Sequence, residues 1–526
     1  MPSSASHNFV RFIRDAASRH PERTALALPD IGRLRGPEIA ERASFSDLWR
    51  RIEILAATLR RKQVGLGDRV LVLVPLSVDL YAAVLAAMAI GAVAVLAPAG
   101  SGLKPFRNAV AAARPQGVIG TRATLRLRWL VPSLWSARAV RTGIQHTGSP
   151  PLELAEVGSG AGALLTFTSG STGRPKGAVR THGTLSAQHR ALDASHPVAD
   201  TAVALTCFPV VALHHLCCGT PTVLPAVDLK DISSVRPDWV LRQLASERIT
   251  DLTGPPPFVQ ALADHALSTG APVEGLRQIG IGGGPVGRSL LEAAAKAFPS
   301  AVTAVIYGST EAEPVASVHA SELLALPAEE IRGYPAGFDD PAARVMLVRV
   351  EDAPVRLEEG ERLADLAVAD GEWGEVIVSG SHVVERYVGA PEEEERNKIR
   401  DEAGTVWHRM GDVACRDERG MLWLGGRVGR MIPGAHGPMA PFPLEIAIER
   451  QPDISRAVLH VWRGNVVLWI EGTPTDEDIG AVRAILAHAG LPDVEMRGGV
   501  RIPVDPRHQW KVDYAALDRM AQKGGG

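Results

Sequence analysis

Residues 46–98 alternate between helical and strand-like hydrophobic patterns. In the first helix, for which Ser46 is a suitable N-cap, the apolar stripe consists of Leu48, Ile52, Leu55, Ala56 and Leu59. Residues 69–74 form a continuous apolar run, which is typical of a strand buried on both faces of a parallel sheet. A second helix, capped by Ser77 and ended by Gly91, precedes a second strand at 92–96. This β–α–β order predicts an α/β fold in which helices cover a parallel sheet.

The same alternation continues through the middle of the chain and then changes character. Strand-like runs occupy 223–225, 249–253, 279–281 and 302–306, with helical stretches at 239–246 and 289–297. From about residue 342 the pattern is that of antiparallel strands, as in 345–350 and 374–379. The last hundred residues have a small α+β pattern, with strands at 458–462 and 466–470 and a helix at 476–489. A glycine cluster at 425–429 places the expected boundary between an N-terminal domain over 1–426 and a C-terminal domain over 427–526.

Composition and charge are those of an ordinary globular protein. Of the 526 residues, 46% are hydrophobic and 22% are charged, which excludes a disordered or fibrous chain. The net charge of −3 gives no sign of nucleic acid or acidic lipid as a partner. Four cysteines without a CxxC pair indicate reduced thiols. With no signal peptide and no membrane span in the pattern, we expect a cytoplasmic protein.

The strongest candidate for chemistry is the glycine- and hydroxyl-rich segment 168–177, which follows the apolar strand-like run 163–167. Glycines let the backbone turn with its N–H groups exposed, and such a concave turn binds phosphate oxygens. The spacing is not that of a Walker A loop. A solvated Ser/Gly turn is the alternative, and the preceding strand argues against it. The residues expected to bind phosphate are Thr168, Ser169, Gly170, Ser171, Thr172, Gly173 and Lys176.

This segment resembles the phosphate-binding signature of the adenylate-forming superfamily, which includes acyl-CoA synthetases, luciferases and the adenylation domains of peptide synthetases. Tyr307-Gly-Ser-Thr-Glu311 is similar to the second motif of that family. The resemblance implies that Tyr307 stacks on adenine beside Gly308, that Thr310 contacts phosphate, and that Glu311 and Thr168 help to hold Mg²⁺. Gly283 and Gly284 are similar to the loop that lies along adenine, although such glycine turns are common.

Three later motifs follow in the order that the family has. His408-Arg-Met-Gly-Asp412 resembles the motif whose aspartate binds both ribose hydroxyls, and Gly426-Arg427 resembles the start of the C-terminal domain, where the arginine reaches ribose or phosphate. Lys511 is similar to the catalytic lysine that swings into the site, so the catalytic residues implied are Lys511 and Glu311. Taken singly, Asp412 is better explained as a turn aspartate, and residue type alone does not distinguish Lys511 from one exposed lysine among many.

The resemblance covers essentially the whole chain and implies both a fold and a reaction. It implies that the antiparallel part is a small barrel-like unit, that parallel sheets flanked by helices make up the rest of the large domain, and that the small α+β C-terminal domain is mobile. It also implies ATP and Mg²⁺ as cofactors and a small-molecule carboxylic acid with an apolar chain as substrate. A carboxylate oxygen would attack the α-phosphorus of ATP, so catalysis needs placed cations and donors rather than a protein nucleophile.

Within that superfamily, four segments resemble the β-lactone synthetases of bacterial long-chain olefin biosynthesis: residues 207–219, 385–392, 406–412 and 503–511. The implied product is a β-lactone, formed when the hydroxyl of a 3-hydroxy fatty acid attacks its own activated carbonyl. An acyl-CoA synthetase, with CoA as second substrate, is the alternative, and an inactive nucleotide-binding scaffold is the alternative of another class. Gly429 and Arg430 at the hinge, and Trp510 before Lys511, depart from the pattern of CoA ligases. Other enzymes of the same pathway are further expected partners.

Two features stay open at this stage. The pair His214-His215 is expected to pack beside the acyl pocket or to gate it, because a metal site asks for three or four ligands and no partner cluster is visible in the sequence. Glu313 would put a charge near the acyl pocket, or would simply face solvent.

Overall fold

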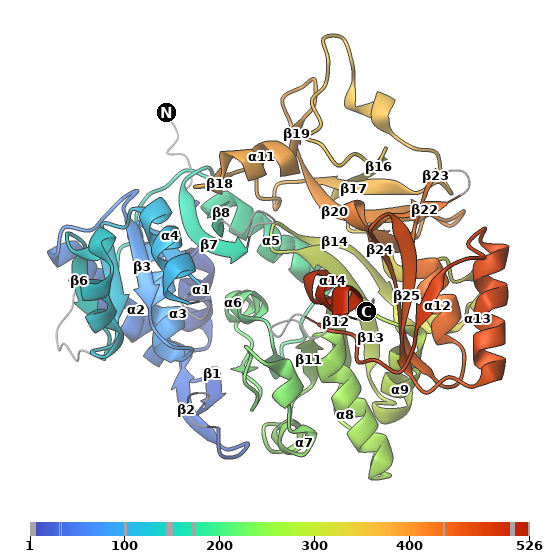
Figure 1. Cartoon of the computed structure of the whole chain (residues 1–526). Helices are drawn as coiled ribbons and strands as arrows, with labels where there is room; N and C mark the ends of the chain where they lie inside the picture. Colours follow the sequence, from blue (N-terminus) through green and yellow to red (C-terminus); the bar gives the residue numbers. More distant parts are fainter. Residues whose placement is uncertain are drawn as a thin grey trace.

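The computed structural model describes residues 7–30, 32, 34–98, 102–143, 151–169, 175–434, 437–504 and 511–523. Two large sheets and a small C-terminal sheet organise these residues, with helices packed against them (Figure 1). No helix of the described residues is long and apolar enough to cross a membrane. The expected α/β fold is confirmed.

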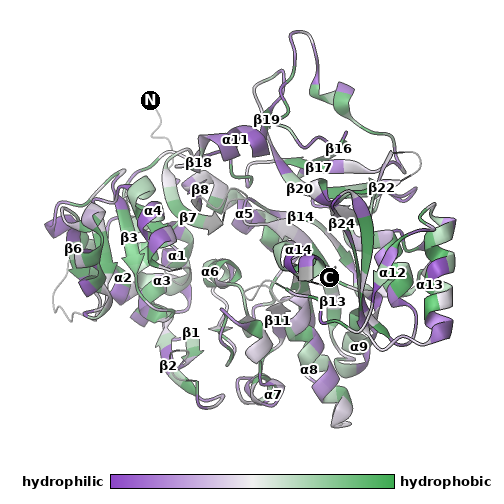
Figure 2. Cartoon of the chain, viewed as in Figure 1, coloured by the Kyte–Doolittle hydropathy of each residue, from purple (hydrophilic) through white to green (hydrophobic). Residues whose placement is uncertain are grey.

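The smaller of the two large sheets is mostly parallel. Among the described residues its strand order is β18 (Tyr387–Val388), β8 (Pro175–Thr181), β7 (Gly162–Ser169), β4 (Val93–Leu96), β3 (Arg69–Leu73), β5 (Gly117–Gly120) and β6 (Arg138–Arg141). Strand β3 is buried on both faces as predicted: Val70 and Val72 belong to one hydrophobic cluster, and Leu71 and Leu73 belong to another. Figure 2 shows most of this strand as hydrophobic, in keeping with the sequence after its first residue, Arg69.

Helices cover both faces of this sheet. The first cluster is shared with α1 (Arg11–Arg19), α2 (Phe45–Arg61) and α3 (Val78–Ala89), and the second with α4 (Leu103–Ala113). Ser77 caps α3 as predicted, since its side chain accepts a hydrogen bond from Leu80 N.

The predicted N-cap of α2 was wrong by two residues. Ser44, not Ser46, accepts a hydrogen bond from Asp47 N, and the Asp47 carboxylate accepts one from Ser44 N. This reciprocal pair requires an acidic or amide side chain three residues after the cap. Ser46 has Trp49 at that position, so only Ser44 can form it.

The larger sheet changes from parallel to antiparallel along its width. Among the described residues its order is β16 (Arg344–Val348), β17 (Gly374–Ser379), β20 (Val406–Arg416), β21 (Leu422–Arg427), β15 (Tyr334–Asp339), β14 (Ala312–His319), β13 (Val302–Ser309), β12 (Gln278–Gly282), β11 (Asp251–Gly254), β9 (Ala204–Thr206), β10 (Thr222–Val223), β1 (Thr24–Pro29) and β2 (Ile39–Ser44), with β19 (Lys398–Arg400) beside β20. Apart from the β1–β2 pair at one edge, the antiparallel part of this sheet begins at the β13–β14 hairpin, about thirty residues before the predicted change, because no helix separates these two strands.

Seven α-helices of the described residues occur in the chain between β8 and β19. They are α5 (His182–Ser195), α6 (Pro209–Cys218), α7 (Pro237–Ser246), α8 (Pro256–Ser268), α9 (Arg288–Ala297), α10 (Ala320–Leu324) and α11 (Pro391–Asn397). Helix α5 follows a strand of the smaller sheet and α6 follows a strand of the larger one, so their contact lies where the two sheets meet (Figure 1).

The C-terminal part builds hydrophobic clusters of its own. A hairpin of β22 (Ile432–Gly434) and β23 (Gly437–Met439) precedes a sheet of β24 (Ile454–Trp462), β25 (Asn465–Gly472) and β26 (Glu495–Arg497), packed with α12 (Phe442–Glu449), α13 (Asp476–His488) and α14 (Tyr514–Lys523). Two clusters, drawn only from residues 432–521, form its core. Arg427 is the last residue of β21 in the large sheet, and the boundary at 426/427 remains our proposal.

Candidate active site

Lys176, Glu311 and Tyr387 meet where the two large sheets adjoin. Lys176 lies on β8 and Tyr387 on the neighbouring β18, while Glu311 lies in the turn between β13 and β14. The Lys176 Nζ is 3.0 Å from Glu311 Oε1, and the same oxygen accepts a hydrogen bond of 3.0 Å from the Tyr387 hydroxyl. Two of the predicted site residues, 135 positions apart in the sequence, are therefore an ion pair.

Glu311 is buried yet ionised. Burial raises the pKa of its carboxyl, but positive neighbours and the hydrogen bonds from Lys176 and Tyr387 outweigh burial and lower the pKa to about 2. Burial lowers the pKa of His408 to about 3, so that ring is neutral at neutral pH, and the ion pair of Glu311 is with Lys176. A buried carboxylate with one oxygen turned to these donors is an oxygen ligand of the kind that Mg²⁺ prefers.

Sequence reasoning assigned no role to Tyr387 or Lys398, which complete this cluster. Lys398 lies opposite His408 in the β19–β20 pair, with its Nζ 5.1 Å from the centre of the Tyr387 ring and donating to Val384 O. Burial lowers the pKa of Lys398 to about 7, although Glu311 opposes the shift. No spacing rule links these residues to the phosphate-binding segment, because Tyr387 is linked to it by the pairing of β18 with β8, and Lys398 reaches the Tyr387 ring from β19.

The phosphate-binding segment itself is described at both ends. Thr168 and Ser169 are the last residues of β7, and their backbones pair with Lys176 and Pro175 of β8. Gly170, Ser171, Thr172 and Gly173 lie outside the described residues, as do the side chains of Thr168 and Ser169. The predicted loop thus connects two adjacent antiparallel strands, with Lys176 at its far side.

Tyr307, Asp412 and Arg427 form a second cluster. The Tyr307 hydroxyl donates to Asp412 Oδ2 over 2.9 Å, and Arg427 Nη1 donates to Asp412 Oδ1 over 2.6 Å. Asp412 and Arg427 face each other across the β20–β21 pair, which fixes this contact through the backbone. A carboxylate has about four lone-pair positions, so Asp412 keeps acceptor capacity for two further hydroxyls.

The glycine residues lie beside this second cluster. Gly283 has φ +81° and directly follows β12, whose Gly282 pairs with Ile306 next to Tyr307. A Cβ on Gly282 would come within 2.9 Å of Ile306 O, so the close approach of the end of β12 to β13 requires glycine there. Gly284 follows in the same loop. The predicted adenine loop is therefore adjacent to the predicted adenine-stacking ring.

A buried arginine positions the turn that carries Glu311. Arg180 donates to Thr310 O over 2.6 Å and to Thr166 Oγ1 over 3.0 Å. Gly308 precedes this turn, where a Cβ would come within 3.0 Å of Ala312 O. The Thr310 side chain is exposed. Arg180 thus links the turn to β7, the strand that leads into the predicted phosphate-binding segment.

Glu313 does not simply face solvent. Its side chain is half-buried, and burial raises the pKa of its carboxyl against the opposing charge of Arg180. This excludes a simply solvent-facing carboxylate, and a position near the acyl pocket remains our proposal.

Lys511 lies on the segment that leads into α14. The segment is held by a bridge between Val504 and Val512, and Lys511 is exposed. Three residues later, the Tyr514 ring lies 4.2 Å from the hinge guanidinium of Arg430 and interacts electrostatically with Arg427. Three residues of chain span at most about 11 Å. Lys511 is therefore within about 11 Å of chain of Tyr514, and its catalytic role remains our proposal.

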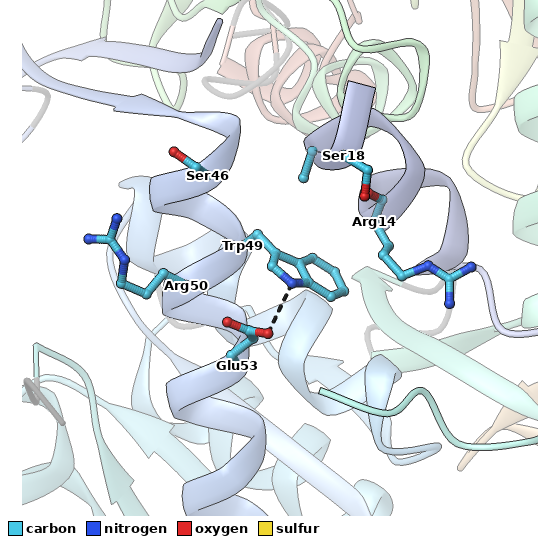
Figure 3. A pocket seen from close by; sticks show the side chains of 7 residues that line it. Arg14, Ser18, Ser46, Trp49, Arg50 and Glu53 are labelled. Atoms are coloured by element: carbon cyan, nitrogen blue, oxygen red, sulfur yellow. Dashed lines mark hydrogen bonds between the residues drawn. The ribbon is translucent and has the colours of Figure 1, made fainter. Parts of the chain in front are cut away.

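A separate hollow lies between α1 and α2 (Figure 3). Its volume is about 240 Å³, and Trp49 donates to Glu53 Oε1 across 3.1 Å within it. None of the predicted site residues lines this hollow, so it is not the candidate active site.

Comparison with known proteins identifies the family. The family model described as AMP-binding enzyme matches residues 13–388. The chain is 29% identical to an olefin beta-lactone synthetase of Stenotrophomonas maltophilia, over 94% of this chain and 97% of that protein. It is 30% identical to a feruloyl-CoA synthase of Amycolatopsis sp., over 78% of this chain and 79% of that protein.

A solved structure with the same fold is that of ATP-bound MatB from Rhodopseudomonas palustris. Its TM-score is 0.78 at 18% identity, over 98% of this chain and 99% of that one. Since the family model spans more than half of the sequence, including both ends of the phosphate-binding segment and the Tyr307–Glu311 motif, this chain belongs to the AMP-binding enzyme family and is an adenylate-forming enzyme.

Proposed function

We propose that this enzyme activates a carboxylic acid with ATP at the site between Lys176 and Asp412. The observation that carries the proposal is the β13–β14 hairpin, which contributes a residue to each cluster. Tyr307 belongs with Asp412 and Arg427, and Glu311, four residues later, belongs with Lys176. A nucleotide lying along the hairpin would have its ribose at Asp412 and its phosphates at Lys176.

In the proposed first step, a carboxylate oxygen of the substrate attacks the α-phosphorus and the bond to pyrophosphate breaks. Negative charge accumulates on the phosphoryl oxygens, so fixed cations lower the barrier. Lys176 and Lys511 are the cations proposed for this task. Glu311, with Thr168, would hold Mg²⁺, which when bound neutralises phosphate charge. Tyr387 orients the Glu311 carboxylate through its hydrogen bond, and Lys398 interacts with that carboxylate electrostatically.

We further propose a 3-hydroxy fatty-acid-like substrate and a β-lactone product. The hydroxyl oxygen would attack the acyl carbon of the adenylate, the bond from that carbon to AMP would break, and the hydroxyl proton would pass to a base or to water. The support is the similarity to olefin beta-lactone synthetases over nearly the full length of both chains. No thiol enters this reaction.

Formation of a CoA thioester is the alternative, and the similarity to a feruloyl-CoA synthase favours it. An inactive nucleotide-binding scaffold is disfavoured, because Glu311, Asp412 and Arg427 keep the residue types and contacts that the chemistry needs.

Two measurements separate these functions. Pyrophosphate release with a panel of carboxylic acids tests activation, and a complete lack of release with every acid would contradict an active enzyme. Mass analysis of the product from racemic 3-hydroxy acids, with and without CoA, then tests the second step. We expect a product lighter than the acid by one water and independent of CoA. A CoA thioester, and no lactone, would establish the alternative.

A further inference from the structure

Charge is distributed unevenly over the chain. Residues 80–152 contain no Asp or Glu, so all 59 acidic residues lie elsewhere in the chain. The same stretch carries eight basic residues: Lys104, Arg107, Arg114, Arg122, Arg126, Arg128, Arg138 and Arg141. All but Arg128 are exposed. The small net charge of the whole chain therefore conceals a strongly cationic surface.

Large apolar side chains are exposed on the same part of the fold. The short 3-10 turns η3 (Thr124–Leu130) and η4 (Pro132–Leu134) follow β5, and around them Leu127, Trp129, Leu130 and Trp135 are 39%, 68%, 56% and 59% exposed. The Arg128 guanidinium lies 5.0 Å from the centre of the Trp129 ring. Exposed apolar groups in such a cluster mark a contact surface.

A cationic hollow lies between α4 and η4. It has a volume of about 630 Å³, and its lining includes Arg114, Arg138, Ser133 and Ser136. Two guanidinium groups and two hydroxyls suit a phosphate group, since arginine binds phosphate through paired hydrogen bonds.

We propose that this surface, formed by α4, β6, η3 and η4, docks on an anionic phospholipid bilayer. Tryptophan and leucine enter the boundary between headgroups and acyl chains, and arginine is attracted to anionic headgroups. Charge favours an anionic bilayer over a symmetric contact with a second copy of this chain, because such a contact would bring two cationic surfaces together. Docking would place the enzyme where acids with apolar chains partition.

Sedimentation of the full chain with vesicles tests this inference. Vesicles of phosphatidylcholine alone are compared with vesicles that also contain phosphatidylglycerol, at low and high salt. We expect binding only to the anionic vesicles, a loss of binding at high salt, and at least a tenfold weaker binding of the double variant Trp129→Ala/Leu130→Ala. Leu267→Ala, which removes an exposed leucine on α8, serves as the control and should bind normally.

Two outcomes would overturn the inference. One is equal or absent binding to both kinds of vesicle. The other is concentration-dependent self-association that Trp129→Ala/Leu130→Ala abolishes, without vesicle binding by the original chain. Pyrophosphate release in solution is expected to be unchanged in both variants, so a failure of docking is distinguishable from a failure of the proposed function.

A separate observation concerns three side chains between α5 and α6. His189 Nδ1 lies 3.0 Å from His214 Nδ1, and Cys218 Sγ lies 3.7 Å from His214 Nε2. One ligand atom from each residue can be chosen so that all three lie within 4.8 Å of one another. Asp193 Oδ1 is 3.7 Å from the same sulfur. The tertiary structure thus supplies the partners for His214 that the sequence pattern did not show.

The spacing of these residues suits a tetrahedral metal ion. His189 and Asp193 are four residues apart on α5, and His214 and Cys218 are four residues apart on α6, so each pair projects from one face of its helix. With Zn–S bonds of about 2.3 Å and Zn–N bonds of about 2.0–2.1 Å, the ligand atoms of one tetrahedral ion are about 3.3–3.7 Å apart, so the chosen atoms, which lie within 4.8 Å of one another, would draw together on binding.

The geometry points to a Zn²⁺ site formed by His189, His214 and Cys218, with Asp193 as fourth ligand. Binding would release the thiol proton of Cys218 to solvent and form a bond from each ligand to the metal. Because α5 follows the smaller sheet and α6 the larger one, the ion would join the two sheets.

Metal titration of the chelator-treated full chain tests the site. With Co²⁺ as probe we expect one ion per chain, a thiolate-to-cobalt absorption band, and displacement by Zn²⁺, which should also raise the melting temperature. Cys218→Ser should lose the band and the thermal shift, whereas Cys217→Ser, which changes the neighbouring buried cysteine, should keep both. Absence of the band in the original chain, or its persistence in Cys218→Ser, would refute the site.

Discussion

Replacing Glu311 by glutamine is the most informative perturbation of the candidate active site. The change keeps the shape of the side chain and removes the charge that faces Lys176 at 3.0 Å. The Tyr387 hydroxyl then donates to a neutral amide instead of a carboxylate, and the proposed carboxylate ligand of Mg²⁺ is lost. One substitution therefore tests both the structural and the catalytic role assigned to this carboxylate.

Two magnitudes follow. Loss of one group that stabilises charge in the transition state costs about 10²–10³-fold in rate, and we expect that loss in the adenylation step. For stability, lowering the pKa of Glu311 from 4.5 to about 2 corresponds to about 3 kcal/mol of unfolding free energy. Because the folded-state pKa is lowered, this contribution is present above pH 4.5 and is lost as pH falls towards 2. The glutamine variant should lack it at every pH.

Pyrophosphate release at saturating ATP and a range of Mg²⁺ concentrations measures the first effect, and denaturant unfolding between pH 3 and 7 measures the second. Glu322→Gln, an exposed glutamate on α10, is the matched control and should behave as the original chain in both assays. The reasoning is refuted if Glu311→Gln keeps its rate within about twofold, a change far below the expected loss. It is also refuted if the stability difference between original and variant does not shrink as pH falls.

Three further predictions concern other parts of the chain. Lys511→Ala should slow adenylation by about 10²–10³-fold with an unchanged melting temperature, and normal pyrophosphate release would exclude its proposed role. Burial raises the pKa of Glu445 to about 8 although Leu459 N donates to it, so its proton is held in the folded state. Stability should therefore fall as pH rises from 4.5 to 8, by at most about 1.4 kcal/mol per unit, and Glu445→Gln should remove this slope in denaturant titrations. Ser44→Ala should lower the unfolding free energy by about 1 kcal/mol by calorimetry, whereas Ser46→Ala should cost less.

The local sequence pattern predicted which helices and strands form more accurately than where they begin and end or how the strands pair. The strands at 69–74 and 92–96 and the helix after Ser77 follow from burial on two faces and from capping, which are decided within a few residues. The cap at Ser44 was missed because two nearby serines compete, and only the acidic residue at the third following position distinguishes them. The onset of antiparallel pairing was placed too late, because a hairpin is defined by the turn and not by the alternation of its strands.

Some residues of the candidate site could be predicted from the sequence, and others could be found only from the structure. Motifs with their own residue types, such as the glycine-rich segment and Tyr307–Glu311, identify themselves in the sequence. Lys398 and Tyr387 do not, because a lysine or tyrosine on a short strand carries no signal until the strand is paired. The cationic surface is an intermediate case, since its charge is present in the sequence but the exposure of its tryptophans is not.

The sequence alone determined the α/β architecture, the order of the nucleotide-binding motifs and therefore the family, because these depend on local hydrophobic period and on residue type at fixed spacing. The tertiary structure decided which charges meet. Lys176 pairs with Glu311, Asp412 with both Tyr307 and Arg427, and His214 with His189, through contacts between strands and helices far apart in the chain. Those contacts fix burial and electrostatic environment, and these in turn set the protonation and chemistry of each group.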